Sequence, residues 1–465
     1  MWRTWSCPVR PAKETGKNNL RFTRTQRASF DPANGAIIMS GQSALTRRQL
    51  LAASAAAGGE AVLLTPEAAC GRWPNDLRVC SQPLAQDYIV VAETPSPDRI
   101  TDDPSLTKLP SGRILATWTF RGTKGVAKHS NPGRYNLASS DDGGQNWQRH
   151  EPLDINMGLP FVHNGMLYLI GNNFGRRDII VSRSADEGRS WHPVVTVFEG
   201  DFWNAPTGYT VADGRIYRAF DSGGGAGRPC SIVAGDLSKD LLSPKSWRLS
   251  NKVGYPGTPE GLTLDRDKYR SGAIRGKAWT DHWLEPNVVE VRGRIMVVLR
   301  ARIDRYAIPN IAAICDASDN GDGLQLEFSR FCAWPGGQHK FHVIYDDVSE
   351  LFWMTTNLAI DSQNSLGLAN RLFEMGWHSG LGNERRFLML YYSIDALTWF
   401  PAGCVAMSSQ PLESFMYAAP MVDGDDLLVL SRTSKSGRNQ HDANLITLHR
   451  VSKFRPLALN LFPEL

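Results

Sequence analysis

Short apolar runs separated by turn residues follow one another along the chain from Asp87 onward. Examples are residues 89–91, 114–118, 166–170 and 295–299. Runs of this length without a three-to-four-residue periodicity are typical of strands rather than helices. The pattern therefore predicts an all-β domain over residues 87–465.

Many of these runs follow a glycine turn. The glycines concerned are Gly112, Gly165, Gly214, Gly293 and Gly424. A tight hairpin turn needs a positive φ, which Gly and Asn adopt at little cost. Each turn is therefore interpreted as the loop of a β-hairpin.

A second turn pattern repeats. Residues 140–147 (SDDGGQNW) and 184–191 (SADEGRSW) both fit S-x-D-x-G-x-x-W, while 393–399 is a shortened copy and 238–247 a degraded candidate. In such a turn the Asp carboxylate accepts backbone N–H groups, Gly supplies the positive φ and Trp fills the apolar layer. The complete copies begin 44 residues apart (184 minus 140), which suits one propeller blade.

These repeats resemble the Asp-box repeats of the sialidase (neuraminidase) superfamily. The resemblance implies a six-bladed β-propeller of four-stranded antiparallel blades with Asp-box turns, its active site on the central axis. Six blades fit between Asp102 and about Val451. The strand near residues 88–93 is expected to close the ring beside the strand at 444–449.

The resemblance extends to residues of the family's active site. Tyr417 lies before the Asp423-Gly424 hairpin and matches the nucleophile, and Glu285 matches the base that activates it. The implied substrate-binding residues are Arg121, Arg300 (300 minus 285, fifteen after Glu285) and Arg386 (393 minus 386, seven before the shortened box). A tyrosine with a pKa of about 10 needs such a base, and arginines match a substrate carboxylate.

The chain departs from the family's pattern in two places. The family has an R-I-P motif where this chain has Asp102-Asp103-Pro104, so Asp102 stands where an arginine belongs. The family's acid/base aspartate precedes a proline, but no carboxylate adjoins Pro160. The candidates for the acid are Asp102 and Asp103, followed by Asp154 and His163.

The resemblance implies an exo-acting glycosidase that cleaves a terminal acidic sugar such as sialic acid. One alternative is a propeller polysaccharide lyase or rhamnosidase-like enzyme on uronate-containing glycans, with His163, His129 or a tyrosine transferring the proton. Another is a glycan-binding propeller without catalysis. The exact sugar and the oligomeric state stay open.

The composition argues against two classes of function, nucleic-acid binding and a zinc ribbon. The net charge is only +4 and no basic run alternates with aromatic residues, which argues against nucleic-acid binding. None of the seven Cys forms CxxC, so a zinc ribbon is not expected. Cys315 with Cys332, and Cys70 with Cys80, are candidate disulfides. No metal or cofactor is expected, and the partner is a glycan.

The N-terminal residues predict export. Thr46-Arg47-Arg48 precedes the small apolar run 52–58, as in twin-arginine signals. This run is too short to span a bilayer. Residues 1–38 are interpreted as a mis-started or disordered leader, 39–69 as the signal peptide and 70–86 as a linker, which predicts a periplasmic or secreted protein. Replacing both arginines by lysine is expected to retain the protein in the cytoplasm, as fractionation would show.

Overall fold

The computed structural model describes residues 28–31, 36–39, 82–122, 135–174, 177–222, 227–262, 281–303, 309–359, 384–437 and 439–459. The chain divides into two units, Met1–Ser81 and Gln82–Leu465. In the first unit, strands β1 (Ala28–Asp31) and β2 (Ala36–Met39) pair antiparallel. The predicted export signal, Cys70, Cys80 and His129 lie outside the described residues.

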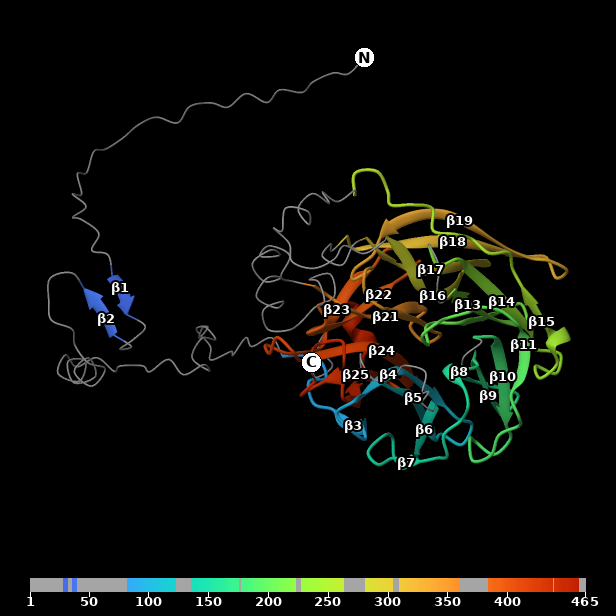
Figure 1. Cartoon of the computed structure of the whole chain (residues 1–465), viewed down its shortest axis with the longest axis horizontal. Helices are drawn as coiled ribbons and strands as arrows, with labels where there is room; N and C mark the ends of the chain where they lie inside the picture. The colour runs from blue at the N-terminus through green and yellow to red at the C-terminus, as the bar shows by residue number, and fades with distance from the viewer. Residues whose placement is uncertain are drawn as a thin grey trace, which may run out of the picture. The chain divides into compact units, whose positions relative to one another are not determined.

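The second unit is a β-propeller, as the sequence predicts. Its described residues form six four-stranded antiparallel sheets, arranged as a ring of blades (Figure 1). Blades 1 to 3 consist of β4 (Arg99–Lys108), β5 (Ile114–Gly122), β6 (Tyr135–Ser140) and β7 (Gln148–Arg149); β8 (Asn156–His163), β9 (Met166–Asn172), β10 (Ile179–Ser184) and β11 (Val195–Phe198); and β12 (Thr210–Ala212), β13 (Arg215–Asp221), β14 (Cys230–Asp236) and β15 (Trp247–Leu249).

Blades 4 to 6 complete the ring. They consist of β16 (His282–Val291), β17 (Arg294–Arg302), β18 (Ile311–Asp319) and β19 (Leu324–Ala333); β20 (His342–Asp346), β21 (Leu351–Asn357), β22 (Phe387–Ser393) and β23 (Phe400–Met407); and β24 (Ser414–Asp423), β25 (Asp426–Ser434), β26 (Leu445–Val451) and β3 (Ile89–Glu93). Two 3₁₀ turns, Pro244–Ser246 and Arg455–Leu459, are also present. No described helix is long and apolar enough to cross a membrane.

The ring closes through the first strand of the propeller. Strand β3 pairs antiparallel with β26, with Ile89 opposite Leu448 and Glu93 opposite Leu445. This confirms the predicted closing strand. Because β3 lies far from β26 in sequence, the pairing ties the two ends of the propeller together and covers a sheet edge that would otherwise be open.

The glycine turns form the first hairpin of five blades. In blade 2, for example, Asn164 and Gly165 have φ of 49° and 74°, and they connect β8 to β9. Two consecutive positive φ values fit the twist of a two-residue hairpin loop. The turns at Gly112, Gly214, Gly293 and Gly424 join the corresponding strands of blades 1, 3, 4 and 6.

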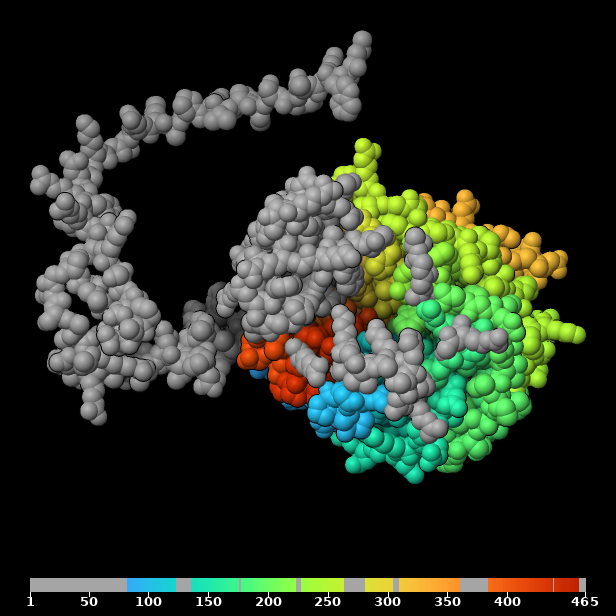
Figure 2. All heavy atoms as spheres, in the orientation of Figure 1, coloured from blue at the N-terminus to red at the C-terminus, as the bar shows by residue number. Residues whose placement is uncertain are grey.

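The apolar core lies between neighbouring blades. Side chains alternate between the two faces of a strand, so each sheet packs on the blade before it and the blade after it. Ile170 and Ile179 of blade 2, for instance, share one cluster with Phe220 and Val233 of blade 3. In the space-filling view these two blades, drawn in green, form a continuous surface (Figure 2).

The S-x-D-x-G-x-x-W segments form turns between the third and fourth strands. The Asp142 carboxylate accepts the N–H groups of Gln145 (3.0 Å) and Asn146 (2.9 Å). The Trp147 indole donates to the Gly144 carbonyl at 2.9 Å. The turn at residues 184–191 repeats this arrangement around Asp186. The tryptophan side chains are only partly buried, so less apolar surface is hidden there than a fully buried Trp would provide.

One candidate disulfide is not formed. Across strands β18 and β19, Cys315 lies opposite Phe328, whereas Cys332 lies opposite Ala312. Both cysteines are free thiols, as are Cys230 and Cys404. The cysteines flank the β18–β19 hairpin as the sequence indicated, but the strand register separates them.

Candidate active site

The inner strands of four blades carry the same distortion near their beginning. The antiparallel ladder is interrupted between Asp102 and Ser105, Asn156 and Leu159, Leu284 and Asn287, and Met416 and Ala419. The first residue inside each interruption has a left-handed φ: Asp103 (51°), Met157 (52°), Glu285 (55°) and Tyr417 (53°). Such a conformation is costly for residues other than glycine and is concentrated at functional sites.

The four bulges present their side chains from equivalent positions. A bulge redirects a side chain out of the regular alternation of a strand. The first strands of consecutive blades contact one another around the ring, including β24 with β4 and β16 with β20. Blade 5 has Lys340 at the corresponding place, two residues before β20. Glu285, Lys340, Tyr417 and Asp103 thus come from consecutive blades 4, 5, 6 and 1.

A hydrogen-bonded chain joins Tyr417, Glu285 and Arg300. The Tyr417 hydroxyl donates to Glu285 Oε1 at 3.0 Å, and Arg300 Nη1 donates to Glu285 Oε2 at 2.6 Å. All three side chains are buried. Burial raises the pKa of Glu285, but the charge and hydrogen bond of Arg300 outweigh it, and the net result is a lowered pKa. Glu285 is therefore ionised at neutral pH and accepts a hydrogen bond from the Tyr417 hydroxyl.

Positive charge surrounds the Tyr417 ring. The guanidinium carbons of Arg385 and Arg432 lie 5.0 and 5.1 Å from the ring centroid, and Lys340 Nζ lies 5.4 Å from it. A cation near the ring stabilises negative charge that develops on the phenol oxygen. Three cationic side chains from blades 5 and 6 and the segment before β22 therefore lie around one tyrosine ring.

Asp102 forms ion pairs with two arginines. Its carboxylate pairs with Arg121 through one oxygen and with Arg432 Nη1 at 2.5 Å through the other. Burial raises its pKa, but the two arginines more than compensate and lower it to about 2. Asp102 is therefore ionised and neutralises much of the charge of two arginines that a substrate anion could otherwise use.

The neighbouring Asp103 has the opposite character. No hydrogen bond or ion pair joins its carboxyl group to other residues in the described part of the chain, and its side chain is buried. Burial and the adjacent negative charge of Asp102 raise the pKa of Asp103 to about 8. Two adjacent carboxyl groups therefore differ in protonation at neutral pH, which is the pattern expected of an acid/base site.

Residues of blade 3 hold the Glu285 bulge in place. The Glu285 N–H donates to the buried Asp221 carboxylate at 2.7 Å. Thr207 and Asn204 donate to the Pro286 carbonyl at 2.5 and 3.0 Å. These bonds satisfy backbone groups that the interrupted ladder leaves without strand partners, so they fix the left-handed conformation of Glu285.

The structure brings most of the predicted site residues together. Glu285, Arg300 and Tyr417 are directly linked, and Asp102 joins Arg121 to the ring of charges. Arg386 is different, because it pairs with Glu384 and lies over the Phe387 ring. Its neighbour Arg385 contacts Tyr417 instead.

The sequence did not indicate three of the cations that lie near Tyr417: Lys340, Arg385 and Arg432. A signal for Arg432 exists in the repeat. Arg432 lies opposite Met416, the residue before Tyr417, as Arg300 lies opposite Leu284, the residue before Glu285. Aligning the two hairpins on their bulges would have identified it. For Arg385 the only signal is its place next to Arg386, just before β22.

The other candidate acids lie elsewhere. His163 is at the far end of β8 from the Met157 bulge, with Nε2 2.9 Å from the Leu237 carbonyl oxygen. Asp154 is exposed and joins none of the described contacts around Tyr417. His163 is therefore not placed to serve the lyase alternative at this site.

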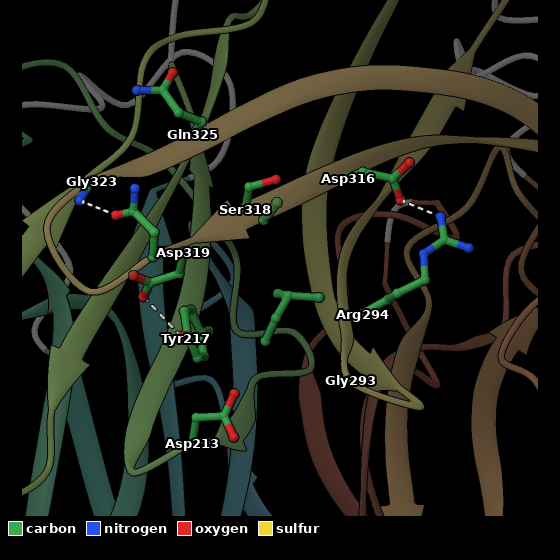
Figure 3. A pocket seen from close by; sticks show the side chains of 12 residues that line it. Asp213, Tyr217, Gly293, Arg294, Asp316, Ser318, Asp319, Gly323 and Gln325 are labelled. Atoms are coloured by element: carbon green, nitrogen blue, oxygen red, sulfur yellow. Dashed lines mark hydrogen bonds and ion pairs between the residues drawn. The ribbon is translucent and has the colours of Figure 1, made fainter.

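A groove of about 570 Å³ lies away from Tyr417, lined by the first hairpin of blade 3 and by the β16–β17 and β18–β19 hairpins of blade 4 (Figure 3). Three of its charged side chains have partners within the protein: Asp319 accepts from Tyr217 at 2.9 Å, and Arg294 pairs with Asp316 at 3.0 Å. Within the described residues, no group of three or more His, Cys, Asp or Glu side chains is arranged to hold a metal ion.

No family model and no curated protein matches the sequence. Among solved structures, the chain is similar to a protein of unknown function from Dyadobacter fermentans (14% identity, 79% of this chain, 98% of that chain, TM-score 0.49). It is also similar to Trypanosoma rangeli sialidase in complex with sialic acid (13% identity, 78% of this chain, 55% of that chain, TM-score 0.48). A third similar structure is an α-L-arabinofuranosidase from Fusarium graminearum (10% identity, 79% of this chain, 98% of that chain, TM-score 0.46). At this level of similarity, function must be argued from the site itself.

Proposed function

We propose that this protein is an exo-acting glycoside hydrolase that uses Tyr417 as its nucleophile. The observation that carries the proposal is the buried chain from Tyr417 through Glu285 to Arg300. Two left-handed bulges in separate blades direct the tyrosine and the glutamate toward each other. A purely structural contact would not require two strained bulky residues to meet around a buried charge.

The proposed first step is transfer of the sugar to Tyr417. The phenol oxygen attacks the anomeric carbon while Glu285 takes the phenol proton. The bond from the anomeric carbon to the leaving oxygen breaks, and that oxygen receives a proton from an acid. Arg300 keeps Glu285 ionised before the step, and the cations around the ring stabilise the charge that builds on Tyr417.

Asp103 is the acid in this proposal, and Asp102 is not. Asp103 retains its proton at neutral pH because burial and Asp102 raise its pKa to about 8. Asp102 is fixed by Arg121 and Arg432 and has no proton to give. In the second step, the deprotonated Asp103 removes a proton from water, and the water oxygen attacks the anomeric carbon. The bond from the anomeric carbon to the Tyr417 oxygen breaks, and Glu285 returns its proton to that oxygen.

The substrate we propose is a glycan with a terminal acidic sugar such as sialic acid. A tyrosine is neutral before it reacts, so it approaches an anionic sugar without the repulsion that a carboxylate nucleophile would meet. The cations within about 5 Å of its ring favour the same charge type. We also propose that residues 39–69 direct export of the protein, which would give it access to such glycans.

The test is a substrate screen with the purified full-length chain. The panel pairs fluorogenic sialosides and glucuronosides with a neutral arabinofuranoside, together with uronate-containing oligosaccharides. Release of the fluorophore with a reducing sugar supports hydrolysis. An unsaturated, ultraviolet-absorbing product would support the lyase alternative, and binding without turnover would support a glycan-binding protein.

A further inference from the structure

The segment just before and within the start of β20 buries an unusual number of unpaired polar atoms. Their side-chain nitrogens have no hydrogen-bond partner among the described residues: Gln338 Nε2, His339 Nε2, Lys340 Nζ and His342 Nδ1. A buried polar group without a partner costs about 1–3 kcal/mol, and native proteins contain few of them. Their concentration in five residues points to a site that a ligand completes.

Lys340 is the charged member of this group. Its side chain is 3% exposed, and Nζ lies 5.4 Å from the centroid of the Tyr417 ring. It stands in blade 5, between the Glu285 blade and the Tyr417 blade. A buried ammonium group without a carboxylate partner is rare in proteins.

Three other cations at the site each have an acceptor within the protein, although Arg300 Nη2 and Arg432 Nε lack hydrogen-bond partners among the described residues. Arg121 and Arg432 share Asp102, while Arg300 donates to Glu285 and, at 2.6 Å, to the Gln338 carbonyl. Lys340 Nζ has neither an ion pair nor a hydrogen bond in the described part of the chain. Of these four cations, Lys340 is therefore the one with all three N–H donors available.

We infer that Lys340 binds the carboxylate of the acidic sugar and so determines the enzyme's specificity. This inference rests on the proposed function, since it assumes that the sugar occupies the space beside Tyr417. In this arrangement Asp102 pairs with two arginines that could otherwise bind an anion, and Lys340 from blade 5 makes the contact to the substrate carboxylate.

The electrostatic surroundings of Lys340 are consistent with this role. It is near Glu285 and Arg300 of blade 4, Tyr417 of blade 6, and Asp102 with Asp103 of blade 1. Burial lowers the pKa of Lys340 to about 8, because the nearby carboxylates offset the lost hydration only in part. A bound carboxylate would stabilise the ammonium form, so affinity should fall as the pH rises through about 8.

The experiment measures binding without turnover, by calorimetry in the Tyr417→Phe background of the full chain. The probes are N-acetylneuraminate and D-glucuronate, each beside its neutral methyl ester. We expect at least one acid to bind more tightly than its ester. Lys340→Met should weaken binding of that acid about 10- to 100-fold, as expected for loss of a desolvated charge contact, and leave the ester within about threefold.

Two comparisons exclude a merely structural effect. Lys252→Met is the matched control, because Lys252 Nζ also lies 5.4 Å from an aromatic centroid, that of Phe202, but its side chain is exposed. It should leave binding of both acid and ester unchanged. Lys340→Met should melt at the same temperature as the parent or higher, since it removes a buried unpaired charge.

The outcomes separate this inference from the proposed function. Lys340-dependent binding of an acid without any hydrolysis in the substrate screen would keep the inference and reject the hydrolase. Hydrolysis of glycosides with acid and ester equally affected by Lys340→Met would keep the hydrolase and overturn the inference. Failure of both acids to bind would also overturn it.

Discussion

The inner bulges and the outer turns of this propeller use aspartate in opposite ways. In the outer turn, Asp142 accepts two backbone N–H groups and lies at the surface, where its hydrogen bonds with Asn146 lower its pKa to about 2. At the inner bulge, Asp103 is buried beside Asp102 and its pKa rises to about 8. An aspartate thus stabilises a turn as a carboxylate in one place and keeps its proton at neutral pH in the other.

The difference lies in how each region satisfies its polar groups. Every donor and acceptor named in the outer turn finds its partner within a few residues, so the turn can form from local sequence. The bulges at Glu285 and Tyr417 depend on partners 15 to 132 residues away. They also place bulky residues at positive φ. The outer turns therefore add local stability to the core between the blades, whereas the inner ends hold strained, charged groups.

The largest effect is expected from Tyr417→Phe. Loss of the phenol oxygen removes the nucleophile, so kcat should fall about 10³-fold or more on every substrate. Stability should change by less than about 1.5 kcal/mol, because only one hydrogen bond is lost and Glu285 keeps Arg300. Steady-state kinetics and urea unfolding measure the two quantities. Full activity in this variant would exclude Tyr417 as the nucleophile.

The next effect concerns Asp103→Asn. The rate should fall about 10²- to 10³-fold on substrates with poor leaving groups, which need a proton, and far less on activated aryl glycosides. At saturating substrate, where the binding contribution of Lys340 is not limiting, the kcat of the parent should fall as the pH rises through about 8, where Asp103 loses its proton. This basic limb should disappear in the variant.

Stability gives an independent reading of the same group. Because the folded state raises the pKa of Asp103 from 3.8 to about 8, its contribution is complete at acid pH and is lost as the pH rises across that interval. At acid pH, where both side chains are neutral, the parent and Asp103→Asn should melt at similar temperatures. As the pH rises toward about 8, the melting temperature of the parent should fall relative to that of the variant. Asp142→Asn is the matched control for the kinetic experiment. It alters the outer turn and should leave the dependence of the rate on the leaving group unchanged.

The smallest effect is expected from Trp147→Ala. The indole is partly buried and donates one hydrogen bond to Gly144, so its loss should lower stability by about 2 kcal/mol, less than the 3–5 kcal/mol typical of a fully buried Trp. Activity per folded molecule should be unchanged. A lower kcat in fully folded protein would show that the outer turn and the site at Tyr417 are coupled, and would contradict the expectation that the two regions are independent.

Local signals in the sequence predicted the strands, the hairpins and a repeat of blade length, and the resemblance to Asp-box proteins implied six such blades in a ring. Gly165 and Gly293 mark hairpins through their positive φ, and the spacing of residues 140–147 and 184–191 gives the length of a blade. The closing strand β3 was also predicted, since a ring needs a partner for the exposed edge of its last blade. Local conformation and spacing are properties that a linear sequence records directly.

The site could be predicted only in part. The resemblance indicated Tyr417, Glu285 and Arg300, which the structure brings into contact, but not Lys340 or Arg432. It also pointed to Arg386, although Arg385 is the residue near Tyr417. Both arginines lie in the segment just before β22 (Phe387–Ser393), so no strand pattern in the sequence distinguishes the one that faces Tyr417.

Only the tertiary structure decided how the charges are divided. From sequence, Asp102 and Asp103 are equivalent candidates for the acid. In the folded chain, Arg121 and Arg432 reach Asp102 from strands β5 and β25, and Asp103 is left without a counter-ion in the described residues. Which carboxyl group keeps its proton, and which cation stays available to a ligand, depends on distances between blades that no local pattern encodes.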